Sequence, residues 1–199
     1  MNPYDLVKAL HMVAVVFMAA PLYNLIVVNE RVQFGKAPLE VDQYFEAIIR
    51  GNSTRCYIFQ LTVLATGVLL ATLNGSAMSV ITNGVLFIKL LLLLTLMGLL
   101  SVVHFSLQPQ IDRLLAQATG NTIPQPLAAQ IAPLRLRRKR LASVCLFLVM
   151  TTVVLGLQVY SRFATRTTVV LLALAAVFTW RVLEEHEQSG QVAGASPTQ

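Results

Sequence analysis

The sequence is poor in charged residues and lacks the motifs that mark most soluble enzymes. Only 12% of its 199 residues are charged, against about 25% in an ordinary soluble domain, and 56% are apolar. It contains no phosphate-binding glycine loop and no group of metal ligands with zinc spacing. Together with a mean hydropathy of +0.68, these absences favour a membrane protein over a soluble domain.

Cysteine and N-terminal signals are also scarce. The two cysteines, Cys56 and Cys145, lie at the starts of separate apolar runs and form neither a CxxC nor a CxxCH motif. We expect them to be buried free thiols. Residues 1–5 lack the basic segment and the cleavage site of a signal peptide. The first apolar run is therefore expected to remain as a helix.

The sequence does contain a series of apolar runs of about 20 residues each. A helix of that length crosses about 30 Å of hydrocarbon. These runs predict an all-α integral membrane helical bundle with about five transmembrane helices, a four-helix core plus a fifth C-terminal span. The expected spans cover residues 5–28, 56–73, 80–104, 141–160 and 167–182. Residues 1–184 would form one transmembrane domain, and residues 185–199 a disordered cytoplasmic tail.

The segments between the spans predict surface structure. Residues 38–50 fit a short amphipathic helix, either at the membrane interface or in a soluble cap, with Leu39, Tyr44, Ala47 and Ile48 on its apolar side. Residues 108–133 suggest another surface helix followed by a flexible connection, because Pro124, Pro126 and Pro133 lie in the second part of this segment.

Positive charge is distributed unevenly over the loops. The loops after the first and third spans hold ten lysines and arginines: Arg31, Lys36, Arg50, Arg55, Arg113, Arg135, Arg137, Arg138, Lys139 and Arg140. The loop after the fourth span holds only Arg162 and Arg166. This bias predicts that the N-terminus lies outside and the C-terminus in the cytoplasm. The membrane we expect is a plasma (bacterial inner) membrane. The net charge of +6 is thus a topology signal, and we expect no nucleic-acid partner.

Three ionisable residues lie inside the expected spans: His11, Lys89 and His104. Each costs roughly 2.5–3.5 kcal/mol on insertion scales, which makes it a functional hypothesis by default. His11 is either a haem ligand or an imidazole that hydrogen-bonds a neighbouring helix. Lys89 lies too deep to reach the interface easily and needs an anion or a polar cavity. His104 is either a ligand or an ordinary boundary histidine.

Helix geometry separates these residues into two levels. Counted from the outer side, His11 and Lys89 differ in depth by only about 5 Å at 1.5 Å per residue. His104 lies roughly 22 Å further inward than Lys89. A single haem therefore cannot use both histidines unless the third span is broken. We expect one outer site with a non-histidine or open sixth iron position, with two separate sites as the alternative.

The segment Lys8-Ala9-Leu10-His11 resembles the first helix of the HemJ-type membrane proteins and their CopD-like relatives. Arg55 before the second span, and the segment from Ile88-Lys89-Leu90 to His104, are similar to that family as well. The resemblance covers roughly residues 6–116. It departs from the family where the basic run 135–140 stands in place of an acidic, proline-containing entry to the fourth helix.

The resemblance implies a haem-b-binding bundle that oxidises protoporphyrinogen IX to protoporphyrin IX. His11 would bind the haem iron, Lys89 and Arg55 would pair with carboxylates, and His104 would be a second polar site or metal ligand. A haem-dependent oxidoreductase, or electron transfer to quinone, is the resulting hypothesis. The alternative is a non-enzymatic subunit that packs, through small residues, against copies of itself or a larger membrane complex.

Overall fold

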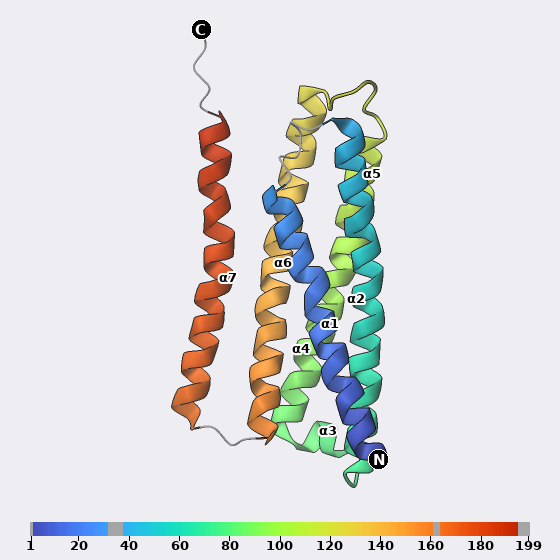
Figure 1. Cartoon of the computed structure of the whole chain (residues 1–199), viewed down its shortest axis with the longest axis vertical. Helices are drawn as coiled ribbons and strands as arrows, with labels where there is room; N and C mark the ends of the chain where they lie inside the picture. Colours follow the sequence, from blue (N-terminus) through green and yellow to red (C-terminus); the bar gives the residue numbers. More distant parts are fainter. Residues whose placement is uncertain (1, 32–37, 161–163, 195–199) are drawn as a thin grey trace.

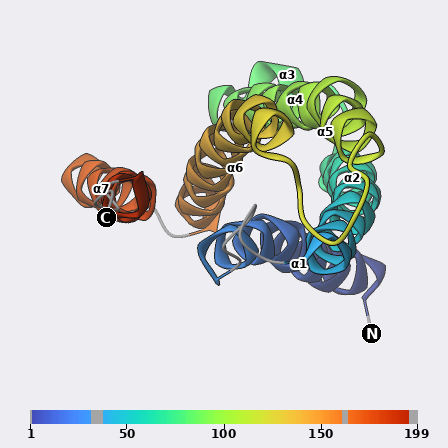
Figure 2. The ribbon, with the colours of Figure 1, turned by 90° about the horizontal axis from the view of Figure 1, so that it is seen from above.

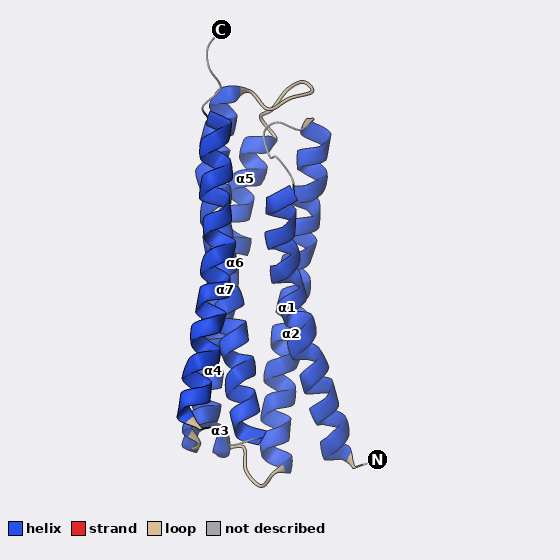
Figure 3. Cartoon of the chain, turned by 60° about the vertical axis from the view of Figure 1, so that its left-hand side comes forward, coloured by secondary structure: helices blue, strands red, loops and turns tan. Residues whose placement is uncertain are grey.

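The computed structural model describes the backbone of residues 2–31, 38–160 and 164–194, and the side chains of residues 2–24, 38–158 and 164–181. Every regular element in these ranges is helical, and the long helices run nearly parallel to one long axis (Figure 3). This confirms the all-α fold class. Arg31, Lys36 and Arg162, whose charges were counted above, have side chains outside the described residues.

Four long helices surround a common core: α1 (Pro3–Arg31), α2 (Leu39–Leu73), α4 (Gly84–Val102) and α6 (Gln125–Tyr160). Figure 1 shows α1 and α4 running opposite to α2 and α6, and Figure 2 shows the ring that they form. Four helical stretches among the described residues are long and apolar enough to cross a membrane: Pro3–Asn24, Leu39–Leu73, Gly84–Leu115 and Gln125–Gln158.

The C-terminal helix α7 (Thr165–Gly194) lies outside this ring and runs beside α6 (Figures 1 and 2). The side-chain amide of Gln158 in α6 donates a hydrogen bond to the hydroxyl of Thr168 in α7. The expected fifth span, residues 167–182, falls within α7. This helix also includes residues 185–194 of the segment expected to be a tail, while residues 195–199 lie outside the described residues.

The third expected span, residues 80–104, is divided at Asn83. A short helix, α3 (Ser79–Thr82), precedes Asn83, and α4 follows it. The Asn83 side chain accepts hydrogen bonds from the backbone N–H groups of Val85 and Leu86 and so caps the N-terminus of α4. The helix then passes through a π-helical segment, η1 (Val103–Leu107), into α5 (Gln108–Leu115) without a break in the helical path.

Two sequence-based expectations are wrong in this region. The segment 38–50 is not a separate interfacial helix, because it forms the first part of α2. The segment 108–133 begins with the expected helix, which is α5, but only its middle is a connection, because α6 begins at Gln125 and includes Pro133. With 35 and 36 residues, α2 and α6 are each about 52 Å long at 1.5 Å per residue, well beyond a hydrocarbon layer of about 30 Å.

The bundle therefore has two cores at different levels. The larger joins α1, α2, α4 and α6 through apolar side chains such as Met18, Val63, Leu96 and Val149. The smaller lies where α5, α6 and the start of α2 meet, and contains Leu39, Ile111, Leu115, Ile123 and Ile131. We call the part of the bundle around the larger core the apolar half, and the part around the smaller core the charged half.

Packing inside the larger core should determine the stability of the apolar half. Leu96 is 1% exposed, whereas Leu94, two residues away on the same helix, is 49% exposed. We expect Leu96→Ala to lower the free energy of unfolding, near the lower end of about 2–5 kcal/mol, and Leu94→Ala to leave it nearly unchanged. Unfolding in mixed detergent micelles measures both, and equal losses would contradict this assignment of the core.

Candidate functional site

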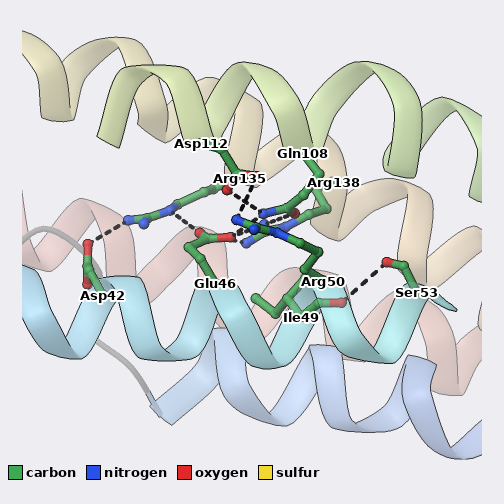
Figure 4. Close-up of polar contacts among 9 residues, drawn as sticks. All are labelled: Asp42, Glu46, Ile49, Arg50, Ser53, Gln108, Asp112, Arg135 and Arg138. Atoms are coloured by element: carbon green, nitrogen blue, oxygen red, sulfur yellow. Dashed lines mark hydrogen bonds and ion pairs between the residues drawn. The ribbon is translucent and has the colours of Figure 1, made fainter. Parts of the chain in front are cut away.

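The charged half contains a cluster of ionised side chains from three helices (Figure 4). Asp42 and Glu46 lie one turn apart on α2, and Arg135 and Arg138 lie one turn apart on α6. Gln108, the first residue of α5, completes the group. All five side chains are buried.

Glu46 is the centre of this cluster. Arg138 donates to both carboxylate oxygens, with Nη1 at 2.5 Å from Oε2 and Nη2 at 3.2 Å from Oε1. Arg135 donates from Nε to Oε1 at 3.0 Å, and Gln108 donates from Nε2 to Oε2 at 2.9 Å. The carboxylate of one residue on α2 is thus bonded to side chains from α5 and α6.

The surrounding contacts close the cluster. Arg135 also bonds Asp42, with Nη1 at 3.1 Å from Oδ2, and Arg138 donates from Nη1 to Oε1 of Gln108 at 2.8 Å. At the rim, a salt bridge of 2.8 Å joins Arg50 to Asp112. The four innermost charges balance as two carboxylates and two guanidinium groups.

Sequence reasoning missed this cluster. It placed Tyr44 on the apolar side of the first turns of α2, but Tyr44 is exposed, and the acidic residues Asp42 and Glu46 face inward instead. It also treated the basic run 135–140 as loop charge, although Arg135 and Arg138 are buried within α6 while Arg137 and Arg140 are exposed. The available signal was the complementary spacing of two acids and two arginines, each pair on one face of its helix.

A second polar group lies in the apolar half, where α1 meets α2. The Nδ1 atom of His11 lies 2.8 Å from Oγ1 of Thr66. That hydrogen bond orients the ring, which also hydrogen-bonds the backbone of Val63. Lys89, on α4, is close enough to His11 to interact with it electrostatically. The residue count along the sequence predicted that these two residues share a level.

Two glycines shape the surroundings of His11 and Lys89. A Cβ atom placed on Gly67 would lie 3.4 Å from Cε1 of His11, so glycine lets the imidazole edge rest against α2. A Cβ atom placed on Gly156 would lie 3.4 Å from Nζ of Lys89, so the ammonium group rests against α6. Among the described residues, no carboxylate forms a salt bridge with Lys89.

His104 belongs to a different level. It lies in η1, and its ring packs edge-on against Tyr57 with centroids 5.9 Å apart. Tyr57 precedes Thr66, the partner of His11, by nine residues of α2, or about 13 Å along the helix. The two histidines therefore do not face one another across a single site. Arg55 is exposed on α2 and lies about 16 Å along the helix from Thr66.

The remaining candidate ligands add little. Cys56 and Cys145 are free and buried, as predicted. Within the part of the chain that the structure describes, no three or more histidine, cysteine and acidic side chains gather in a way that could hold a metal ion.

Comparison of this chain with models of protein families, with curated proteins and with solved structures finds no match. The assignment of a function therefore depends on the chemistry of the two polar groups described above.

Breaking the cluster should destabilise the charged half. Truncation of Glu46 leaves the buried guanidinium group of Arg138 without its anion and leaves Arg135 paired with Asp42 alone. Loss of one partner of a buried pair costs about 3–5 kcal/mol. We expect Glu46→Ala to lower the free energy of unfolding by that amount in mixed micelles. The matched control is Arg50→Ala, which removes a salt bridge from a side chain that is 56% exposed and should cost at most about 1 kcal/mol. Similar effects of the two substitutions would contradict a central role for Glu46.

Proposed function

We propose that this chain is an integral membrane protein that binds haem b through His11 and serves a redox role. The observation that carries the proposal is the hydrogen bond between Nδ1 of His11 and Thr66. Histidines that bind metals are commonly held in this way through the nitrogen that does not bind the metal, which orients the other nitrogen toward it. A proximal histidine is also a common axial ligand of haem iron.

The residues around His11 fit the group chemically. Haem b carries two propionates, and Lys89 supplies a positive charge beside His11 that no described carboxylate neutralises. His11 would bind the iron, Thr66 would orient the ring, and Lys89 would pair with a propionate. The haem would supply one-electron redox chemistry, either in porphyrinogen oxidation or in electron transfer to quinone. Arg55 on α2, and His104 in η1 beside Tyr57, lie too far from the level of Thr66 to join this site.

Absorption spectroscopy tests the proposal directly. Protein purified from haem-replete cells should show a Soret band, and His11→Ala should abolish it because the axial ligand is lost. His104→Ala is the matched control and should retain the band, since His104 lies at another level. Thr66→Val should weaken haem affinity by about 10–100-fold, the usual effect of removing a group that orients a ligand.

Two outcomes would oppose haem binding at His11. One is a colourless wild-type preparation, and the other is a Soret band that survives in His11→Ala. A colourless protein that purifies together with a second membrane protein would instead favour the alternative of a non-enzymatic subunit of a larger complex.

We further propose that the apolar half lies in a bacterial inner membrane and that the charged half projects into the cytoplasm. The start of α1 and the ends of α2 and α6 lie at one end of the bundle, and the beginnings of α2 and α6, which carry the charge cluster, lie at the other (Figure 1). Exposed arginines such as Arg113, Arg137 and Arg140 belong to the charged half. This distribution agrees with the preference of lysine and arginine for the cytoplasmic side.

Reporter fusions test this orientation and the fifth span together. Alkaline phosphatase should be active when fused after Ser76 or after Phe163, because both positions would lie outside. A fluorescent protein fused after Gln199 should fluoresce, because α7 would return the chain to the cytoplasm. An active phosphatase at the C-terminus would contradict the fifth span, and inactive phosphatase after Ser76 would contradict the orientation.

A further inference from the structure

The helix that begins with α4 changes its hydrogen-bond pattern at η1. The backbone N–H of Gln108 bonds the carbonyl of Val103, five residues earlier, so this turn holds one residue more than an α-helical turn. Such π-helical turns within α-helices are rare and occur frequently at functional sites. His104 lies in this turn, about 6 Å along the helix from Gln108 of the charge cluster. It is therefore placed where the apolar half begins.

The imidazole of His104 has one nitrogen inside the protein and one at its surface. The Nδ1 atom is buried and has no hydrogen-bond partner among the described residues. The side chain as a whole is half-buried, and Nε2 remains accessible. Because a buried N–H group without an acceptor is rarer than an unpaired acceptor, the proton of the neutral ring belongs on Nε2. His104 thus presents a hydrogen-bond donor at the accessible edge of its ring.

Aromatic side chains surround this donor. The Phe105 ring packs edge-on against His104 with centroids 4.9 Å apart, on the same helix, and Tyr57 does so from α2. The Tyr57 hydroxyl lies 2.6 Å from Oγ of Ser101, a hydrogen bond that ties α2 to α4 and fixes the tyrosine ring. Phe105 itself is 72% exposed. The rings that pack against His104 are neutral, so this surface suits a neutral acceptor with a flat ring better than a phosphate group.

We propose that His104, Tyr57 and Phe105 form a binding site for the ring of a membrane quinone. A quinone is a flat, neutral, lipid-soluble molecule whose carbonyl oxygens only accept hydrogen bonds. The Nε2–H group of His104 donates to one carbonyl, and the exposed ring of Phe105 packs against the quinone ring, as aromatic rings do in offset-stacked and edge-to-face pairs. The isoprenoid tail extends among the lipid chains beside the bundle, so the quinone enters sideways from the membrane.

This site is separate from the one around His11. Tyr57 and Thr66 are nine residues apart on α2, or about 13 Å along the helix. Binding of a quinone at His104 does not require haem, and only its use as an electron acceptor rests on the function proposed above. Haem-free protein in lipid nanodiscs is therefore the material for the test.

The first measurement locates the quinone. A photoreactive azido analogue of ubiquinone is activated in the nanodiscs, and the labelled residues are mapped by mass spectrometry. We expect labels in η1 and in the turns of α2 around Tyr57, and we expect an excess of decylubiquinone to suppress them. Labels spread over the exposed apolar face of α7, with no effect of the competitor, would overturn the proposal.

The second measurement tests the donor on His104. His104→Phe keeps an aromatic ring but removes the N–H group, and it should lower the affinity for decylubiquinone by about two- to tenfold, the usual effect of losing one hydrogen bond. His104→Gln should retain more affinity than His104→Phe, because its side-chain amide can donate. Equal affinities of the wild type and His104→Phe would overturn the proposal.

The third measurement tests the aromatic contact. Phe105→Leu should weaken binding of decylubiquinone severalfold. Phe178→Leu is the matched control, because Phe178 is also exposed, at 47%, but lies on α7, and it should bind like the wild type. Equal losses in the two variants would contradict a site at Phe105.

A wild-type measurement decides the matter even if the variants fail to fold. With isotope-labelled histidine, the Nε2 signal of His104 in nuclear magnetic resonance spectra should shift when decylubiquinone is added. A signal that ignores decylubiquinone but changes with the phospholipid headgroup would assign this surface to a phospholipid and overturn the quinone site. Quinone binding by a protein that never binds haem would support the site while refuting the haem function. A haem-containing protein without quinone labelling would do the reverse.

Discussion

The carboxylate of Glu46 is the group on which the architecture of the charged half depends. It is 1% exposed and accepts hydrogen bonds from Arg135, Arg138 and Gln108. An ionised carboxylate removed from water is stable only when such partners surround it, because the desolvation cost is several kcal/mol per ion. The cluster therefore fixes the rotation and the axial position of α2 relative to α6, since either change would separate the charges. Two helices that each extend about 20 Å past a hydrocarbon layer are held side by side in this way.

The basic side chains of residues 135–140 in α6 have two different roles, which a count of charges cannot distinguish. Arg135 and Arg138 face inward and neutralise Asp42 and Glu46, whereas Arg137 and Arg140 face outward. Only the outward pair is available to lipid head groups and solvent. The bias of lysine and arginine toward one end nevertheless remains, because the inward arginines and their acidic partners belong to the same end. The excess of lysine and arginine that predicts the orientation is therefore still present, although much of this charge is balanced by acidic partners.

The apolar runs predicted the helical class and the four helices of the ring, because hydrophobic length is a local property of the sequence. The charge cluster could not be predicted in the same way. Glu46 and Arg135 are 89 residues apart, and the apolar residues beside Glu46 suggested the opposite rotation of the helix. At the other site, residue counting brought His11 and Lys89 to one level because the rise per residue of a helix is constant. The pairing of Thr66 with His11 could not be predicted, because a threonine in an apolar run usually bonds to the backbone of its own helix.

The inward face of α2 carries residues of both polar groups, Glu46 in the charge cluster and Thr66 beside His11. Burial of polar atoms in an apolar bundle is costly, and Oε1 of Gln60 on this face has no hydrogen-bond partner among the described residues. A bundle that needed only stability would carry leucine at Gln60, as α4 does along its buried face. The polar face of α2 thus runs from the charge cluster to Thr66, which holds the imidazole of His11, at a cost in stability that an apolar helix face would avoid.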